Sequence, residues 1–138
     1  MKFLKLFIVI GVLLSATGCA TISRYDQYSY MQAVNLKVDS LKLMDSAGDA
    51  YSAHKSEVQE IKVRTEKAYE YEKGRPQNQV TTDMWKLMID TKGGLLGGFF
   101  VLWEESGTVS PVFVPEKKKQ IANAFDEIIS LESEKIKK

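Results

Sequence analysis

The chain has 138 residues, of which 44% are hydrophobic and 27% charged, and its formal net charge is +1 at pH 7. This composition excludes intrinsic disorder, which requires low hydrophobicity and high net charge, and the length predicts a single domain. The near balance of charges gives no electrostatic basis for a nucleic-acid partner.

The amino terminus departs from this average composition. Residues 1–5 carry two lysines, residues 6–14 (LFIVIGVLL) have no charged or polar side chain, and residues 15–18 are small. A basic start, a short apolar run and small residues before a cleavage point are typical of a secretory signal peptide. The apolar run is too short for a membrane span, which needs about 20 apolar residues.

The lone cysteine stands directly after these small residues. The segment Ala16-Thr17-Gly18-Cys19 resembles the lipobox of bacterial lipoproteins, with Ala16 where that family most often has leucine. The resemblance covers residues 1–20. It implies cleavage between Gly18 and Cys19, a thioether-linked diacylglycerol on Cys19, and acylation of the new amino terminus by a fatty acid such as palmitate. The alternative is an ordinary signal peptide that leaves a free thiol.

The resemblance also implies an address and a domain plan. It places the chain in the bacterial cell envelope, and Ala20 after the cysteine, rather than aspartate, favours the periplasmic face of the outer membrane in a host with two membranes. We expect residues 1–18 to be removed, residues 19–24 to form the lipid anchor and a short tether, and residues 25–138 to form one helical domain. Because the chain has no second cysteine, this domain must be stabilised by core packing.

The first two predicted helices follow the tether. Ser23 is a candidate cap for the first, and apolar residues recur with helical spacing on one face: Met31, Val34, Val38, Leu41 and Met44. The second is predicted over residues 51–73 and ends at Gly74 and Pro76; its seam is Tyr51, His54, Val58, Ile61, Thr65 and Ala68. A short loop between two such helices predicts an antiparallel αα-hairpin.

Three further helical segments are predicted after the hairpin. One begins near Thr81, with Val80 and Trp85 at the two positions of a hydrophobic staple. A short one covers residues 95–105, and a last one carries the seam Ile121, Phe125, Ile128 and Leu131. If the last helix began at Ser110, Pro115 would kink it. No segment alternates with the period of a strand. The predicted fold class is therefore all-α, a small helical bundle built on a long antiparallel αα-hairpin with two or three further helices.

The most apolar segment after residue 18 is GGLLGGFFVLW, residues 93–103. It lacks the lysine and hydroxyl of a phosphate-binding loop and is too short to span a bilayer, while its glycine spacing permits close helix approach. Two interpretations stay open. These residues either close the core, or they form an exposed surface for a partner or ligand, for which the candidate residues are Trp85, Met88, Phe99, Phe100 and Trp103.

The tyrosines offer a second candidate surface. An antiparallel hairpin returns Tyr69 and Tyr71 close to Tyr25 and Tyr28, near the predicted anchor. Tyr25 and Tyr28 then either pack at the end of the hairpin or form a membrane-proximal patch that binds a partner.

Residues for catalysis or metal binding are sparse. His54 is the only histidine and lies on an apolar seam, and one imidazole with nearby carboxylates does not make a zinc site. No serine or cysteine relay accompanies it. We therefore expect no enzyme, no metal and no cofactor apart from the covalent lipid. The terminal Lys138 stands where the murein lipoprotein is joined to peptidoglycan; the alternative is a favourable charge at a helix carboxyl terminus.

The leading hypothesis is a lipid-anchored, non-catalytic envelope protein with a binding or structural role toward a protein partner at the membrane surface. The alternative is a carrier of a lipid or small apolar ligand in a pocket around residues 85–103. A carrier requires an open apolar cavity of about 300 Å³ or more.

Overall fold

The computed structural model describes residues 22–137, and this part of the chain contains helices and no strand. The elements are α2 (Gln27–Met44), α3 (Tyr51–Lys73), α4 (Gln79–Ile89), α5 (Leu96–Ser106), α6 (Phe113–Glu134) and a final 3₁₀ turn, η1 (Lys135–Lys137). The predicted all-α helical bundle is thereby confirmed. The predicted signal peptide, the cleavage site at Gly18 and Cys19, and the terminal Lys138 lie outside the described residues. Within the described part, no helix is both long and apolar enough to cross a membrane.

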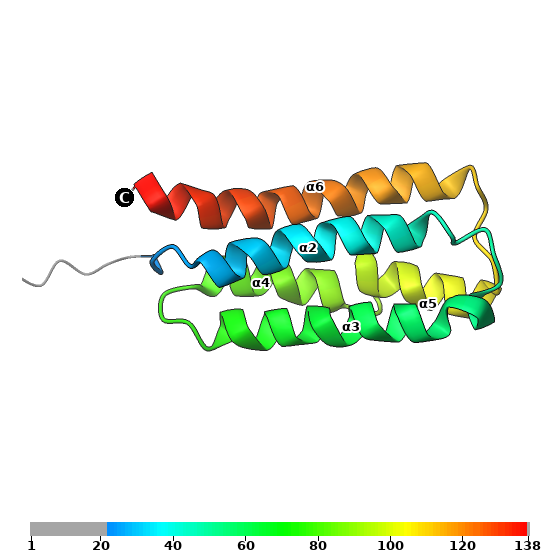
Figure 1. Cartoon of the computed structure of the whole chain (residues 1–138), viewed down its shortest axis with the longest axis horizontal. Coiled ribbons are helices and arrows are strands. Elements are labelled where there is room, and N and C mark those ends of the chain that lie inside the picture. Colours follow the sequence, from blue (N-terminus) through cyan, green and yellow to red (C-terminus); the bar gives the residue numbers. More distant parts are fainter. Residues whose placement is uncertain (1–21, 138) are drawn as a thin grey trace, which may run out of the picture.

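The helices form an antiparallel bundle with four positions, of which α4 and α5 share one (Figure 1). α2 packs against α3 and α6, and α4 packs against the same two helices, so α2 and α4 lie diagonally across the bundle. Residues 22–26, the α3–α4 loop and η1 meet at one end, which we call the base end. The opposite far end carries the α2–α3 loop and residues 107–112.

Aromatic side chains fill the bundle core. Trp85 and Phe125 meet edge to face with ring centroids 6.1 Å apart, which joins α4 to α6. In the far half, the indole N–H of Trp103 donates to the Asp49 carbonyl oxygen at 3.1 Å, which fastens α5 to the α2–α3 loop. Each such buried side chain contributes about 1.5–3 kcal/mol or more, so core packing can stabilise the domain without a disulfide.

The predicted core face of α2 is right only toward the end of the helix, where Met44 is buried and Leu41 packs against the core. The helix buries Ala33, Leu36, Ser40, Leu43 and Met44. Only Met44 belongs to the predicted stripe among these, while Met31 and Val38 are 45% and 59% exposed. The buried face contains the small residues Ala33 and Ser40, which allow neighbouring helices to approach closely. Two apolar residues of the predicted stripe, Met31 and Val38, therefore remain outside the core.

Two predicted helix starts also differ from the structure. Asp26, not Ser23, caps α2, since its Oδ1 accepts from the Ser29 N–H at 3.0 Å. α4 begins at Gln79, and Val80 is exposed rather than part of a staple. α6 begins at Phe113, which places Pro115 in the first turn of the helix. Backbone N–H groups of the first turn have no intrahelical acceptor, so the N–H that proline lacks is not needed there. Pro115 therefore does not kink the helix.

The glycines of the apolar segment allow the chain to break between α4 and α5. A Cβ at Gly97 would lie 2.5 Å from the Ile89 carbonyl oxygen, and one at Gly98 would lie 1.7 Å from that of Gly93. The start of α5 thus presses directly against the backbone that precedes it. The glycine spacing thus permits a close backbone contact between the start of α5 and the α4–α5 loop region, rather than between two separate long helices.

We predict that Gly98→Ala lowers the free energy of unfolding by about 2–3 kcal/mol, because the added methyl group must displace backbone rather than a movable side chain. Gly48→Ala is the matched control, since a Cβ at Gly48 meets nothing within 4 Å. Urea unfolding followed by circular dichroism measures both. Equal midpoints for the two variants would contradict the proposed constraint.

Candidate functional site

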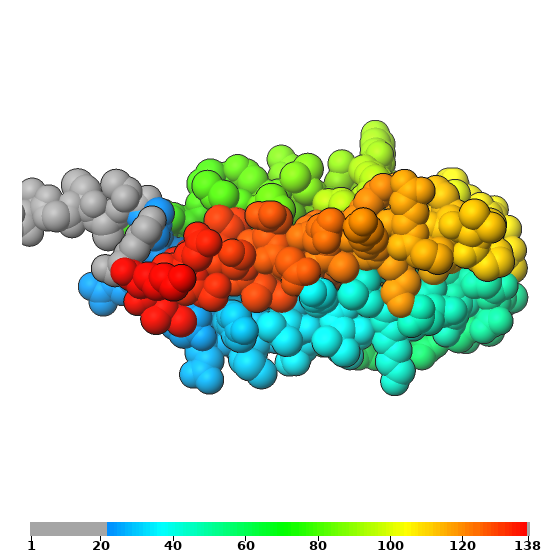
Figure 2. Space-filling model, turned by 90° about the horizontal axis from the view of Figure 1, so that it is seen from above, coloured from blue at the N-terminus to red at the C-terminus, as the bar shows by residue number. Residues whose placement is uncertain are grey.

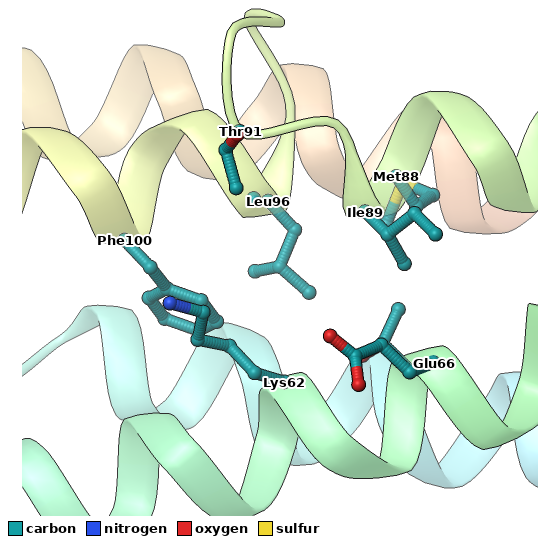
Figure 3. Close-up of a pocket in the computed structure, with 9 residues that line it drawn as sticks. Lys62, Glu66, Met88, Ile89, Thr91, Leu96 and Phe100 are labelled. Atoms are coloured by element: carbon teal, nitrogen blue, oxygen red, sulfur yellow. The ribbon is translucent and has the colours of Figure 1, made fainter.

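The structure places the first candidate set in the core. Trp85, Met88, Phe99, Phe100 and Trp103 are all buried. Beside them, α3, α4 and α5 leave a cleft of about 40 Å³, lined by residues that include Lys62, Met88 and Phe100 (Figure 3). That volume holds about one to three water molecules. It is far below what a carrier of a lipid or apolar ligand requires at this position.

The second candidate set lies at the base end of α2. Tyr28 is 60% exposed, whereas Tyr25 is half-buried and faces Tyr30. The ring of Tyr28 packs on that of Tyr71 with centroids 4.9 Å apart, and the Tyr71 hydroxyl donates to Asp26 Oδ2 at 2.8 Å. The hairpin therefore brings Tyr28 and Tyr71 together, as the antiparallel prediction required.

An exposed apolar surface continues from these rings along α2. It consists of Tyr28, Met31, Val38 and Tyr71, and we call it the Tyr28 surface. Beside it runs a groove of about 290 Å³ between α2 and α3, lined by residues that include Gln32, Leu36 and Lys67. The Gln32 Oε1 atom is buried there without a hydrogen-bond partner among the described residues.

A buried ion cluster closes the base end, and sequence analysis did not predict it. Its charged members are Glu72, Arg75, Glu132 and Lys135. Arg75 donates to both carboxylate oxygens of Glu132, at 3.0 and 3.1 Å, and to Glu72 at 2.8 Å. Lys135 donates to Glu132 at 2.5 Å. Glu132 is only 1% exposed, so these hydrogen bonds replace its water shell.

The same cluster holds the start of the described chain. The Asp26 N–H donates to Glu132 Oε1 at 2.6 Å, and Arg75 donates to the Arg24 carbonyl oxygen at 2.5 Å. Ser23, in the predicted tether, is buried; its hydroxyl donates to Asn78 at 2.8 Å and its N–H to the Gln77 carbonyl oxygen at 2.9 Å. The folded body therefore includes residues that the sequence assigned to the tether.

Electrostatics indicate that Glu132 is ionised. Burial by itself raises the pKa of Glu132, but hydrogen bonds from Arg75, Lys135 and the Asp26 N–H outweigh it and leave the pKa below its usual value. Burial acts in the same way on Asp26, where hydrogen bonds from the Ser29 N–H and Tyr71 again leave the pKa lowered. Glu132 and Asp26 are thus held as charged acceptors.

His54 has structural partners. Its Nδ1 lies 2.7 Å from Glu57 Oε2, its Nε2 lies 3.5 Å from Asp49 Oδ2, and its ring packs near Trp103 with centroids 5.5 Å apart. The hydrogen bond to Glu57, opposed by desolvation, raises the pKa of His54. Among residues 22–137, no group of three or more His, Cys, Asp and Glu side chains is arranged to hold a metal ion.

A sequence signal for the ion cluster did exist. Extending the α3 seam four residues beyond Ala68 gives Glu72, and extending the α6 seam four residues beyond Ile128 gives Glu132. A carboxylate on an apolar seam is a candidate buried charge. The predicted α3 seam stops one position too soon, and the predicted α6 seam continues to Leu131, which is only half-buried, instead of Glu132.

Comparison with known proteins gives no relative, since the chain matches no protein-family model, no curated protein and no solved structure.

We predict that Glu132→Gln lowers the free energy of unfolding at pH 7 by about 3 kcal/mol, because Arg75 and Lys135 lose their buried counter-charge. The control is Glu134→Gln on the exposed side of the same helix, for which a change within about 0.5 kcal/mol is expected. Because the folded-state pKa of Glu132 is lowered, its contribution is present above the unfolded pKa and is lost as pH falls through the folded value. The difference between wild type and Glu132→Gln should therefore shrink on acidification. Urea titrations at pH 7 and pH 3 measure it, and an unchanged difference would contradict this role.

Proposed function

We propose that the protein is a lipid-anchored, non-catalytic component of the bacterial cell envelope that binds a protein partner through the Tyr28 surface. The observation that carries the proposal is that part of an apolar stripe on α2 stays exposed, although the stripe has the spacing of a core face. Met31 and Val38 stand on that stripe, with Tyr28 at its base end.

The composition of this surface favours a protein partner. Tyrosine and methionine are enriched in the buried centre of protein interfaces, where large side chains with few rotatable bonds contribute area at low entropic cost. Tyr28 is already held by Tyr71, and Tyr71 by Asp26, so binding needs little further ordering of these rings.

The neighbouring groove extends the contact. Gln32 and Lys67 offer polar groups there, beside the exposed apolar side chain of Met31. An amphipathic segment could lie along α2 with its apolar residues on the stripe and a donor toward Gln32 Oε1, which resembles the helix-in-groove mode of recognition. The Arg64–Asp39 ion pair, 2.8 Å between Nη1 and Oδ2, lies on the same side of the bundle and would flank it.

The anchor supports the location. The segment ending at Cys19 resembles the lipobox of bacterial lipoproteins, and with such an anchor Ala20 favours the outer membrane in a two-membrane host. A single acyl chain binds membranes weakly, whereas a diacylglycerol with an added acyl chain anchors stably. The Tyr28 surface begins nine residues after Cys19 in the sequence, so the proposed partner is also at the membrane.

We predict that the mature wild-type chain begins at Cys19 and carries the mass of a diacylglycerol plus one acyl chain, and that it floats with membranes. Cys19→Ala should abolish the added lipid mass and the flotation, because it removes the sulfur that accepts the diacylglycerol. Ser15→Ala leaves the cysteine in place and serves as control. Intact-mass spectrometry and membrane flotation provide the readouts. A wild-type chain without added lipid mass would refute the anchor.

We predict that a photocrosslinker in place of Met31 gives a discrete protein adduct in membranes, while one in place of Leu87 does not. Leu87 is the matched control because it is exposed on α4, diagonally across the bundle. Tyr28→Ser should reduce the Met31 adduct about fivefold, the effect of losing ~1 kcal/mol of binding free energy. Equal adducts from both positions, or no effect of Tyr28→Ser at unchanged thermal stability, would contradict binding at the Tyr28 surface.

A further inference from the structure

We infer that the base end of the bundle rests in the membrane interface, with Ile22, Val80 and Ile136 in contact with lipid. The inference rests on the proposed anchor at Cys19 and adds what the anchor alone does not give, namely the orientation of the folded domain.

The first step is the shortness of the connection. The structure fixes the chain from Ser23 onward through Asn78, Gln77 and the ion cluster. Three Cα–Cα steps separate Cys19 from Ile22, a reach of about 11 Å even when fully extended. A lipid on Cys19 therefore holds Ile22 within about 11 Å of the anchored residue. The base end cannot move far from the bilayer.

The second step is the character of this end. Val80, in the first turn of α4, is 64% exposed, and Ile136, in η1, is 63% exposed. Ile22 and Val80 line one groove of about 300 Å³ with Leu131 and Lys135, so aliphatic side chains from three segments gather at this end. Figure 2 shows residues 22–26 and η1 side by side there, with the far end at the opposite pole. Exposed aliphatic side chains next to an anchored residue suit the boundary of headgroups and acyl chains.

The third step concerns charge. Arg24, Lys73, Lys137 and Glu134 are exposed at this end, and Lys73 is paired with Glu70 at 3.3 Å. Among residues 22–137, the remaining cations of the base end, Arg75 and Lys135, are engaged with buried carboxylates. The exposed charges of the described residues at this end nearly cancel, so the contact is apolar and does not depend on anionic lipid. Tyr28 and Tyr71 stand at the edge of this end, at the depth where tyrosine commonly meets headgroups.

The orientation has a direct test because the lipid consumes the only thiol in the chain. Val80→Cys and Ile136→Cys then each give a single reactive cysteine in the lipidated protein. Val112→Cys is the matched control, since Val112 is 87% exposed at the far end. Each variant is spin-labelled, reconstituted by its own anchor into vesicles, and measured for collision with oxygen and with a water-soluble nickel chelate. One vesicle type is phosphatidylcholine alone, and the other contains phosphatidylethanolamine and phosphatidylglycerol.

We expect labels at positions 80 and 136 to be shielded from nickel and accessible to oxygen, and the label at 112 to show the reverse. The shielding should be the same in both vesicle types. If the protein floats with the vesicles, its anchor is intact. If the labels at 80 and 136 are then as accessible to nickel as the label at 112, the proposed orientation is overturned while the anchor stands. Shielding confined to the anionic vesicles would overturn the apolar basis of the contact. A chain without lipid mass would overturn the anchor and this inference together.

Discussion

The buried carboxylate of Glu132 is the constraint on which the base end depends. Transferring an ion from water into a protein interior costs several kcal/mol, and only complete hydrogen bonding offsets that cost. Glu132 obtains it from Arg75, Lys135 and the Asp26 N–H, groups that belong to the α3–α4 loop, η1 and the cap of α2. Apolar contacts tolerate small sliding movements of helices, whereas these directional bonds do not. The cluster therefore sets the relative register of the helices that meet there.

The far end is held by a different kind of contact. Backbone bonds from the Val109 N–H to the Ala47 carbonyl oxygen and from the Tyr51 N–H to the Gly107 carbonyl oxygen join the two loops, and Trp103 fills the space beneath them. Between α4 and α5, the glycines allow the chain to break and restart as a second helix within the same position of the bundle. The bundle thus combines a polar, register-setting end with an aromatic, space-filling end.

Sequence patterns predicted where the helices lie in the chain better than they predicted which face of each helix is buried. The α3 helix could be placed over 51–73 because Gly74 and Pro76 stop it, and the fold class followed from helical spacing throughout. The buried face of α2 could not be chosen, because apolar residues lie on more than one side of the helix and only the neighbouring helices decide which of them are covered. Glu72 and Glu132 were overlooked because their burial depends on Arg75, a partner distant in sequence from Glu132. The aromatic residues of 85–103 had two interpretations, which only packing could separate.

Asp26 connects the ion cluster to the Tyr28 surface. Its N–H donates to Glu132, its Oδ1 caps α2 through the Ser29 N–H, and its Oδ2 accepts from the Tyr71 hydroxyl that packs on Tyr28. One residue thus fixes the start of the described chain, the first turn of α2 and the exposed rings. In the proposed function, the surface that meets the partner would be held rigidly to the end that carries the anchor. A rigid link of this kind reduces the conformational freedom lost on binding, so a small apolar surface can suffice when the membrane already confines both proteins.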